Sequence, residues 1–286
     1  MKKEKKTEKE REPQYYRSVT GDRMINYHVY YMSQLEKIIY FLAAFIAGGA
    51  VGYLFYGGIG KDEFGDPTVL TYILNFIVIV VCGTVAGKLF LPIRNQQIVN
   101  SRKKKLKSQF RDMLEALATS LGSGKNVQDS FRTAYEDLTN QYDEGAFILH
   151  ELKVINSGVL NGINIEELIS DFGKRSACTD IEDFAGVFEV CYRRGGNIRE
   201  TIHNTCRIIV DKMAVSQEIE TTVAGSKNEQ YIMLVMPICL VGMIKMSSPE
   251  FAANFATPSG VISTTIAIAL FVVSYFIGRK LLDIKV

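Results

Sequence analysis

A glycine-rich segment at residues 122–125 is the part of the sequence that most resembles a site for nucleotide chemistry. It reads Gly-Ser-Gly-Lys, and in a phosphate-binding loop such residues offer backbone N–H groups and an ammonium to phosphate oxygens. That loop also needs a glycine five positions before Gly124 and a Ser or Thr after the lysine. These positions hold Thr119 and Asn126, and no strand pattern precedes them. We therefore expect no nucleotide site.

Other catalytic and metal-binding patterns are missing as well. The sequence has no G-x-S-x-G, no H-E-x-x-H and no row of intramembrane carboxylates that would relay protons. The three histidines, His28, His150 and His203, stand alone without a second ligand at helical spacing. The five cysteines form no C-x-x-C pair, so we expect reduced, buried thiols. The sequence predicts no enzyme activity, no metal and no cofactor.

Four stretches almost free of charge supply the main signal of fold class. They cover residues 38–57, 69–87, about 230–246 and 261–278, each close to the ~20 apolar residues that cross a bilayer. Lys245 near the end of the third and Lys88 just past the second are long amines that reach an interface. No secretory signal peptide precedes the first stretch, which we expect to remain in the mature protein. The sequence predicts a polytopic membrane protein with four transmembrane helices.

The distribution of basic residues predicts the orientation of these spans. Residues 1–37 hold nine Lys or Arg and residues 88–111 hold eight, whereas residues 58–68 hold one and residues 247–260 none. Because basic residues resist translocation, both termini and the long middle segment should be cytoplasmic. The formal net charge of the whole chain is only +2, which gives no field that would draw it to nucleic acid.

The N-terminal residues divide into two predicted parts. Residues 1–14, rich in Lys and Glu, should be a disordered leader. The tyrosines that follow predict an interfacial segment leading into the membrane rather than a binding site; they are Tyr15, Tyr16, Tyr27, Tyr30 and Tyr31.

Glycine pairs with G-x-x-x-G spacing occur in the first two spans. Gly48 and Gly52 form one pair, and Gly83 and Gly87 form the other. Such pairs let helix backbones approach closely in lipid. The motif fits packing of the two spans on each other and also packing on a partner.

The segment from 92 to 229 carries a helical pattern throughout. Apolar residues recur there every three or four positions in six successive stripes, which include Leu106, Phe131, Ile148, Leu168, Phe184 and Ile202. Amphipathic helices with short connections predict an antiparallel six-helix bundle. The repetition also fits a helical solenoid, but tethers to the membrane at both ends favour the closed bundle.

Three connections in this segment share one pattern, in which a glycine is followed two residues later by asparagine and an acid comes three residues after the asparagine. A glycine tolerates the left-handed end of one helix, and the asparagine caps the next. The residues are Gly124 and Asn126, Gly162 and Asn164, and Gly195, Gly196 and Asn197.

These turns predict a docking surface. If each helix reverses direction, all three turns lie at the tip farthest from the bilayer. The candidate partner-binding residues there are Ser123, Lys125, Ile163, Arg193 and Arg194. Solubility and helix capping alone would also explain any one of them.

The order of these features resembles a known family. Two spans, a helical domain containing the stretches 109–121 and 194–202, and a third span bearing Pro237 followed by a fourth are similar to the type II secretion F family. Within it the chain most resembles the platform proteins of tight-adherence pili. Many secretion members carry two copies of the helical domain, whereas this chain has one, which fits the tight-adherence type. The charged leader has no counterpart in the family pattern.

The resemblance implies a non-enzymatic platform in the bacterial inner membrane, part of a type IV pilus or type II secretion machine. Its implied partners are a cytoplasmic secretion ATPase, pilin or pseudopilin subunits, membrane lipid, and either itself or a paralogous platform subunit. The domains would be a cytoplasmic leader at 1–37, a first transmembrane hairpin at 38–91, the cytoplasmic bundle at 92–229, and a second hairpin with a short cytoplasmic tail at 230–286. A subunit of a membrane transporter or channel is the alternative, because Asn75 and Lys245 are polar residues within the spans.

Overall fold

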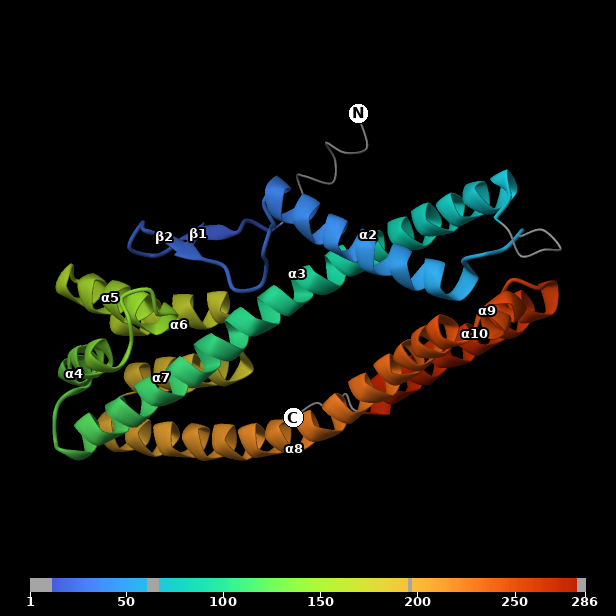
Figure 1. Ribbon diagram of the computed structural model, residues 1–286. Coiled ribbons are helices and arrows are strands. Elements are labelled where there is room, and N and C mark those ends of the chain that lie inside the picture. The colour runs from blue at the N-terminus through green and yellow to red at the C-terminus, as the bar shows by residue number, and fades with distance from the viewer. Residues whose placement is uncertain (1–11, 61–66, 195–196, 282–286) are drawn as a thin grey trace. The chain divides into compact units, whose positions relative to one another are not determined.

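The computed structural model describes residues 12–60, 67–194 and 197–281. It is nearly all-α, with one short two-stranded sheet (Figure 1). The elements are β1 (Tyr15–Arg17), β2 (Arg23–Ile25), α2 (Gln34–Tyr56), α3 (Val69–Gly122), α4 (Val127–Gln141), α5 (Phe147–Leu160), α6 (Ile165–Ser176), α7 (Thr179–Arg194), α8 (Ile198–Ser247), α9 (Pro249–Phe255) and α10 (Pro258–Leu281).

The chain divides into two compact units. One, which we call the helical unit, comprises the described residues up to Tyr31 together with those of Asn95–Val215. The other, which we call the span unit, comprises the described residues of Met32–Arg94 together with those from Ser216 onward. Helices α3 and α8 each contribute to both units.

Among the described residues, four helices are long and apolar enough to cross a membrane. They are Gln34–Tyr56, Val69–Gly122, Ile198–Ser247 and Pro258–Gly278. Few side chains in their apolar windows are buried, from 0% to 11%, as expected of helices that face lipid or partner helices. The prediction of a nearly all-α chain with four such helices is confirmed.

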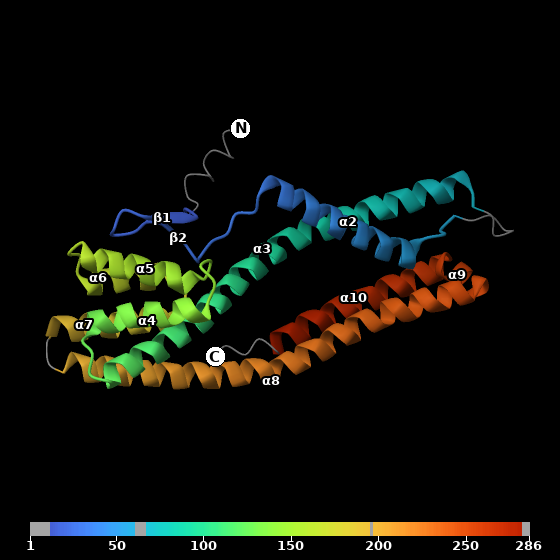
Figure 2. The same cartoon turned by 60° about the vertical axis from the view of Figure 1, so that its left-hand side comes forward.

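The helical unit is built around one apolar core. The second half of α3, all of α4 to α7 and the first part of α8 contribute to it. Helix α5 packs on α4 and α6, and α6 packs on α7, so these helices lie side by side (Figure 2). The largest side chains at its centre are phenylalanines from different helices, with edge-to-face contacts between Phe110 and Phe184 and between Phe131 and Phe188. Every predicted stripe contributes apolar residues to this core.

Both long helices continue through a proline. Helix α3 runs unbroken through Pro92, and α8 runs unbroken through Pro237. Proline removes a backbone hydrogen bond from a helix interior, and in each helix the proline lies within or beside an apolar stretch. The boundary that we expected at residue 92 therefore falls inside a continuous helix.

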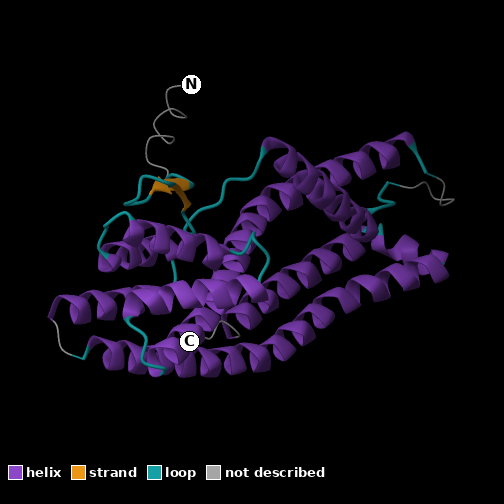
Figure 3. Cartoon of the chain, turned by 90° about the vertical axis from the view of Figure 1, so that its left-hand side faces the viewer, coloured by secondary structure: helices purple, strands orange, loops and turns teal. Residues whose placement is uncertain are grey.

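The sheet is a hairpin near the N-terminus (Figure 3). Its strands are antiparallel, with Tyr16 opposite Met24. Pro13 and Gln14, which we expected to be disordered, accept hydrogen bonds from the side chain and backbone of Asn26. Residues 1–11 of the predicted disordered leader lie outside the described residues.

The hairpin also corrects the predicted interfacial belt of tyrosines. Tyr27 is 2% exposed and belongs to the core of the helical unit, and the ring of Tyr30 stacks on the Arg102 guanidinium of α3 at 4.2 Å. Tyrosine has an apolar body and a polar tip, so it suits a protein core as well as a lipid interface. The expectation was wrong for Tyr27.

Candidate partner-binding surface

The Gly-x-Asn turns of the helical unit combine a left-handed glycine with a helix cap. Gly124 and Gly162 have φ values of 96° and 79°, where a side chain would be strained. Asn126 caps α4 by accepting a hydrogen bond from the Asp129 N–H at 2.8 Å. Asn164 directly precedes α6 without such a cap bond. Two of the three turns thus have the glycine conformation expected of a helix end.

The third turn is described only in part. Gly195 and Gly196 lie outside the described residues, as does the side chain of Arg194. Asn197 directly precedes α8; its side chain accepts a hydrogen bond from the Glu200 N–H at 3.4 Å and donates one to the Glu200 carboxylate.

The first and third turns lie next to each other, and so do the second and third. Arg199 near the start of α8 donates a hydrogen bond to the Gly124 carbonyl at 3.2 Å. Glu166 and Glu167 at the start of α6 line the same polar hollow as Arg193 at the end of α7. All three turns therefore gather at one end of the helical unit.

The candidate tip residues differ in their surroundings. Lys125 is exposed and donates to the Thr133 hydroxyl at 2.8 Å, whereas Arg193 pairs with Glu189 of its own helix at 3.0 Å. The Ser123 hydroxyl donates to the Ser120 carbonyl at 2.8 Å. Ile163 packs partly against the core, so it presents less surface than its place in the turn suggests.

The charge of this end is mixed rather than simply positive. Carboxylates of Asp129, Glu166, Glu167 and Glu189 lie beside the cations. A partner that docks here would meet both positive and negative side chains. Such a mixed surface favours one particular docking orientation and gives little overall electrostatic attraction.

A buried ionic network that sequence reasoning missed lies in the same unit. Arg175 of α6 is 3% exposed and forms two parallel hydrogen bonds to Glu151 of α5, at 3.0 and 2.8 Å. Its Nε donates to Asp171 at 2.9 Å. The Tyr27 hydroxyl donates to Glu151 at 3.1 Å. Burial and then the charge and hydrogen bond of Glu151 raise the pKa of Tyr27 well above its usual value.

A signal for this network exists in the sequence. Glu151 lies three residues after Ile148, and Arg175 lies three after Phe172, so each charge sits on the apolar stripe of its helix. Two opposite charges on apolar faces of neighbouring helices are the pattern expected of a buried pair. That pattern could have located it.

A second ionic cluster joins three helices. Asp180 of α7 accepts from Lys107 of α3 at 3.0 Å and from Lys212 of α8 at 2.8 Å. Burial alone would raise the pKa of Asp180, but the hydrogen bonds and charges of the two lysines outweigh it and lower this pKa. The run of basic residues on α3 thus includes at least one residue used for packing.

In the span unit, the glycine pairs lie where α2 crosses α3. A Cβ atom on Gly48 would lie 2.4 Å from the Cβ of Ala86, and one on Gly83 would lie 2.7 Å from the ring of Phe45. Gly52 faces Cys82, and Gly87 faces Phe41, with similar closeness. Of the two arrangements that the motif allowed, the structure has the spans packed on each other.

The five cysteines differ in exposure. All are free thiols; Cys178 and Cys206 are buried, Cys82 and Cys191 are half-buried, and Cys239 is exposed. Among the three thiols outside the apolar spans, the expectation of burial therefore holds for Cys178 and Cys206 and fails for the half-buried Cys191.

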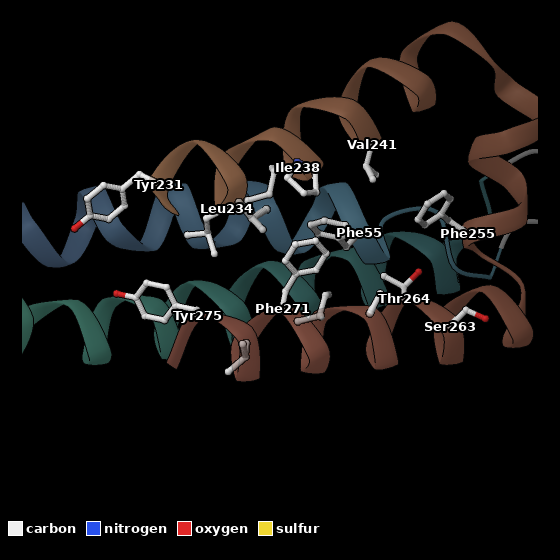
Figure 4. Close-up of a pocket in the computed structure, with 15 residues that line it drawn as sticks. Phe55, Tyr231, Leu234, Ile238, Val241, Phe255, Ser263, Thr264, Phe271 and Tyr275 are labelled. Atoms are coloured by element: carbon white, nitrogen blue, oxygen red, sulfur yellow. The ribbon is translucent and has the colours of Figure 1, made fainter. Parts of the chain in front are cut away.

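An apolar groove opens within the span unit between α2, α8, α9 and α10. Its volume is about 600 Å³. Phe55, Leu234 and Phe271 supply apolar walls, while Ser263 and Thr264 supply hydroxyls near one end (Figure 4). It offers no titratable groups other than tyrosines.

Among residues 12–60, 67–194 and 197–281 no cluster of three or more His, Cys, Asp or Glu side chains is arranged to hold a metal ion. Comparison of the chain with models of protein families, with curated proteins and with solved structures finds no match.

Proposed function

We propose that this chain is an inner-membrane platform protein of a type IV, tight-adherence-like pilus or of a type II secretion machine. In this role it couples a cytoplasmic secretion ATPase to the assembly of pilin or pseudopilin subunits. It performs no chemistry itself.

The main support for this proposal is that α3 and α8 each extend from one unit of the chain into the other. Each helix combines a candidate membrane span with a segment of the helical-unit core. Each helix is unbroken between these two segments, so force applied to the core of the helical unit has a path through the helix backbone into the span. A platform that transmits motion needs such a path.

In this proposal the helical unit is a cytoplasmic six-helix bundle. Its helices are the end of α3, α4 to α7 and the start of α8, which share one apolar core. In the proposed orientation both termini are also cytoplasmic, because the basic residues flank the spans on that side. The three gathered turns are the surface that we propose for the ATPase.

The exposed apolar side chains of the spans are the surface that we propose for membrane lipid and for the apolar segments of pilins. A second platform chain, identical or paralogous, would cover part of the same surface. Nucleic acid has no place in this account.

The main support for a transporter or channel, the polar residues of the spans, is weakened by the contacts that they make. Asn75 accepts a hydrogen bond from the Gly58 N–H at 3.0 Å, and Lys245 donates to the Leu54 carbonyl at 2.6 Å. Both serve the end of α2. Ion flux through liposomes that contain the purified protein alone would favour the transporter and contradict the platform.

Charge reversal at the tip tests the proposed coupling in cells. Replacing Lys125, Arg193 and Arg194 together with glutamate should abolish pilus assembly while membrane insertion stays normal. The matched control reverses Lys153, Arg207 and Lys227, which are exposed elsewhere, and should leave assembly intact. Normal assembly in the tip variant would remove the electrostatic part of the docking surface.

A further inference from the structure

Residues 12–31, which we call the strap, attach to the helical unit mainly around Tyr27, with Ile25 packed against the core and the ring of Tyr30 on Arg102 of α3. The strap comprises β1, β2 and the turn after them (Figure 1). Tyr27 is its central contact: the ring meets Phe147 edge to face at 5.5 Å, and the backbone N–H donates to the Arg175 carbonyl at 3.1 Å. Ser18 donates to Asp171 at 3.1 Å, and His28 contacts the Lys174 carbonyl at 3.2 Å.

The charges beneath the strap are paired without it. The guanidinium of Arg175 uses Nη1 and Nη2 on Glu151 and Nε on Asp171, and all three residues belong to α5 and α6. Removal of the strap would therefore expose a complete ion pair to water and leave no lone buried charge. Because burying an ion pair costs solvation, its renewed hydration offsets part of the lost contact.

The strap also satisfies much of its own backbone. The two strands pair with each other, the Ser18 N–H donates to the Asp22 carbonyl at 2.9 Å, and the Asn26 N–H donates to the Gln14 carbonyl at 2.9 Å. Its release would remove from the helices that it covers only the contacts named above and the hydrogen bond that Arg175 Nη1 donates to the Ile25 carbonyl at 3.4 Å. A segment that keeps its own hydrogen bonds, and that covers helices whose charges stay paired without it, can open locally.

We propose that the strap is a releasable latch on α5 and α6, which detaches while the helices stay folded. The chain passes from the strap directly into α2. A docked strap therefore ties the helical unit to α2 through non-covalent contacts, in addition to the chain connections through α3 and α8. Release leaves only those two. The claim that this latch regulates a platform rests on the proposed function. The claim that the strap detaches does not depend on it.

Hydrogen exchange on the full-length protein in lipid nanodiscs tests the release. The Tyr27→Phe variant keeps the ring and removes the hydroxyl that bonds to Glu151, a hydrogen bond to a charged group worth roughly a tenfold factor in the opening equilibrium. Amides of the strap should therefore exchange about tenfold faster, while those of α4 to α7 should not change. Tyr15→Phe is the matched control, because Tyr15 is 45% exposed in the same strap, and it should change nothing.

Two results would overturn the latch. Strap amides that exchange as slowly as those of α5 and α6 in the unaltered protein would make the strap part of the core. Equal acceleration of the strap and the helices in Tyr27→Phe would show that they open together.

A cross-linked strap tests the regulatory use. Val19 and Ser170 line the same hollow, so Val19→Cys with Ser170→Cys, joined by a short bis-maleimide, should suppress strap exchange and alter pilus assembly. Each single cysteine variant should behave normally. Normal assembly with a strap shown to be locked would overturn the regulatory use, and it would leave the platform itself standing.

Discussion

The Nζ atom of Lys245 donates a hydrogen bond to the backbone carbonyl of Leu54 at 2.6 Å, and the same ammonium lies 4.7 Å from the centre of the Phe255 ring. Leu54 lies in the last turn of α2, where carbonyls lack a partner within the helix and the helix end is partly negative. Lys245 therefore caps α2 from α8. A lysine that hydropathy analysis treats as an interruption of a span joins the two halves of the span unit.

Replacing Lys245 with methionine should destabilise the span unit by about 1.5–3 kcal/mol, because the variant keeps the length of the side chain and loses a charged hydrogen bond. Thermal unfolding in detergent would measure this. Met246→Leu is the control, since the neighbouring side chain is 89% exposed. Equal stability of the lysine variant and the control would show that the contact contributes nothing.

A larger side chain at a glycine where α2 crosses α3 should push the two helices apart. In Gly48→Val the new side chain would meet Ala86 and the backbone of Cys82, and the overpacking should cost about 1–3 kcal/mol. Gly225→Ala is the matched helical glycine, because a Cβ there meets no atom within 4 Å. That variant should gain up to about 1 kcal/mol from helix propensity. Opposite signs in the two unfolding experiments are the predicted result, and losses of equal size would contradict the crossing.

The lowered pKa of Asp180 predicts a dependence of stability on acid pH. A carboxyl whose pKa is lower in the folded chain stabilises fully above its unfolded pKa of about 3.9, and this contribution is lost as the pH falls through the folded value. Asp180→Asn should therefore lower the melting temperature near neutral pH and flatten its fall below about pH 4. Asp183→Asn should do less, because that carboxylate is exposed and lies 3.5 Å from Lys212. Parallel melting curves for the unaltered protein and Asp180→Asn would contradict the lysine contacts.

Two cysteines of the helical unit, Cys206 and Cys191, should differ in their rates of reaction with a thiol reagent. Burial raises the pKa of Cys206 to about 12, so almost no thiolate forms at pH 8 and maleimide should not label it in the folded protein. Cys191 is half-buried and should react faster. Peptide mass spectrometry after timed labelling would compare them, and equal rates would show that the core around Cys206 opens readily.

The sequence predicted the elements that follow a simple periodicity. Runs of apolar residues located the four spans, and stripes such as the one containing Leu106 located the core helices, because burial of one face is what fixes each helix. Glycines 48 and 83 marked a close crossing, but the motif could not specify the partner. The G-x-x-x-G pattern requires only a nearby backbone, which the structure identifies as the neighbouring span.

Contacts between distant residues escaped this reasoning. The strands near Tyr16 and Met24 have only three residues each, too short to produce an alternating pattern. Tyr27 packs against residues more than a hundred positions away, and nothing in its neighbours distinguishes a core tyrosine from an interfacial one. The tip of the helical unit could be predicted only in part. Its turn glycines were visible in the sequence, but the carboxylates beside Arg193 depend on how α6 and α7 pack.

Site-specific photo-crosslinking in cells tests the central claim most directly. Probes at Ser123, Ile163 and Arg194 report on the three gathered turns, and a probe at Gln141 reports on the connection that leaves the far end of α4. The account predicts that mass spectrometry finds a secretion ATPase cross-linked to the first three positions and not to Gln141. Capture of no ATPase at any position, with cross-links only between copies of this chain, would contradict it.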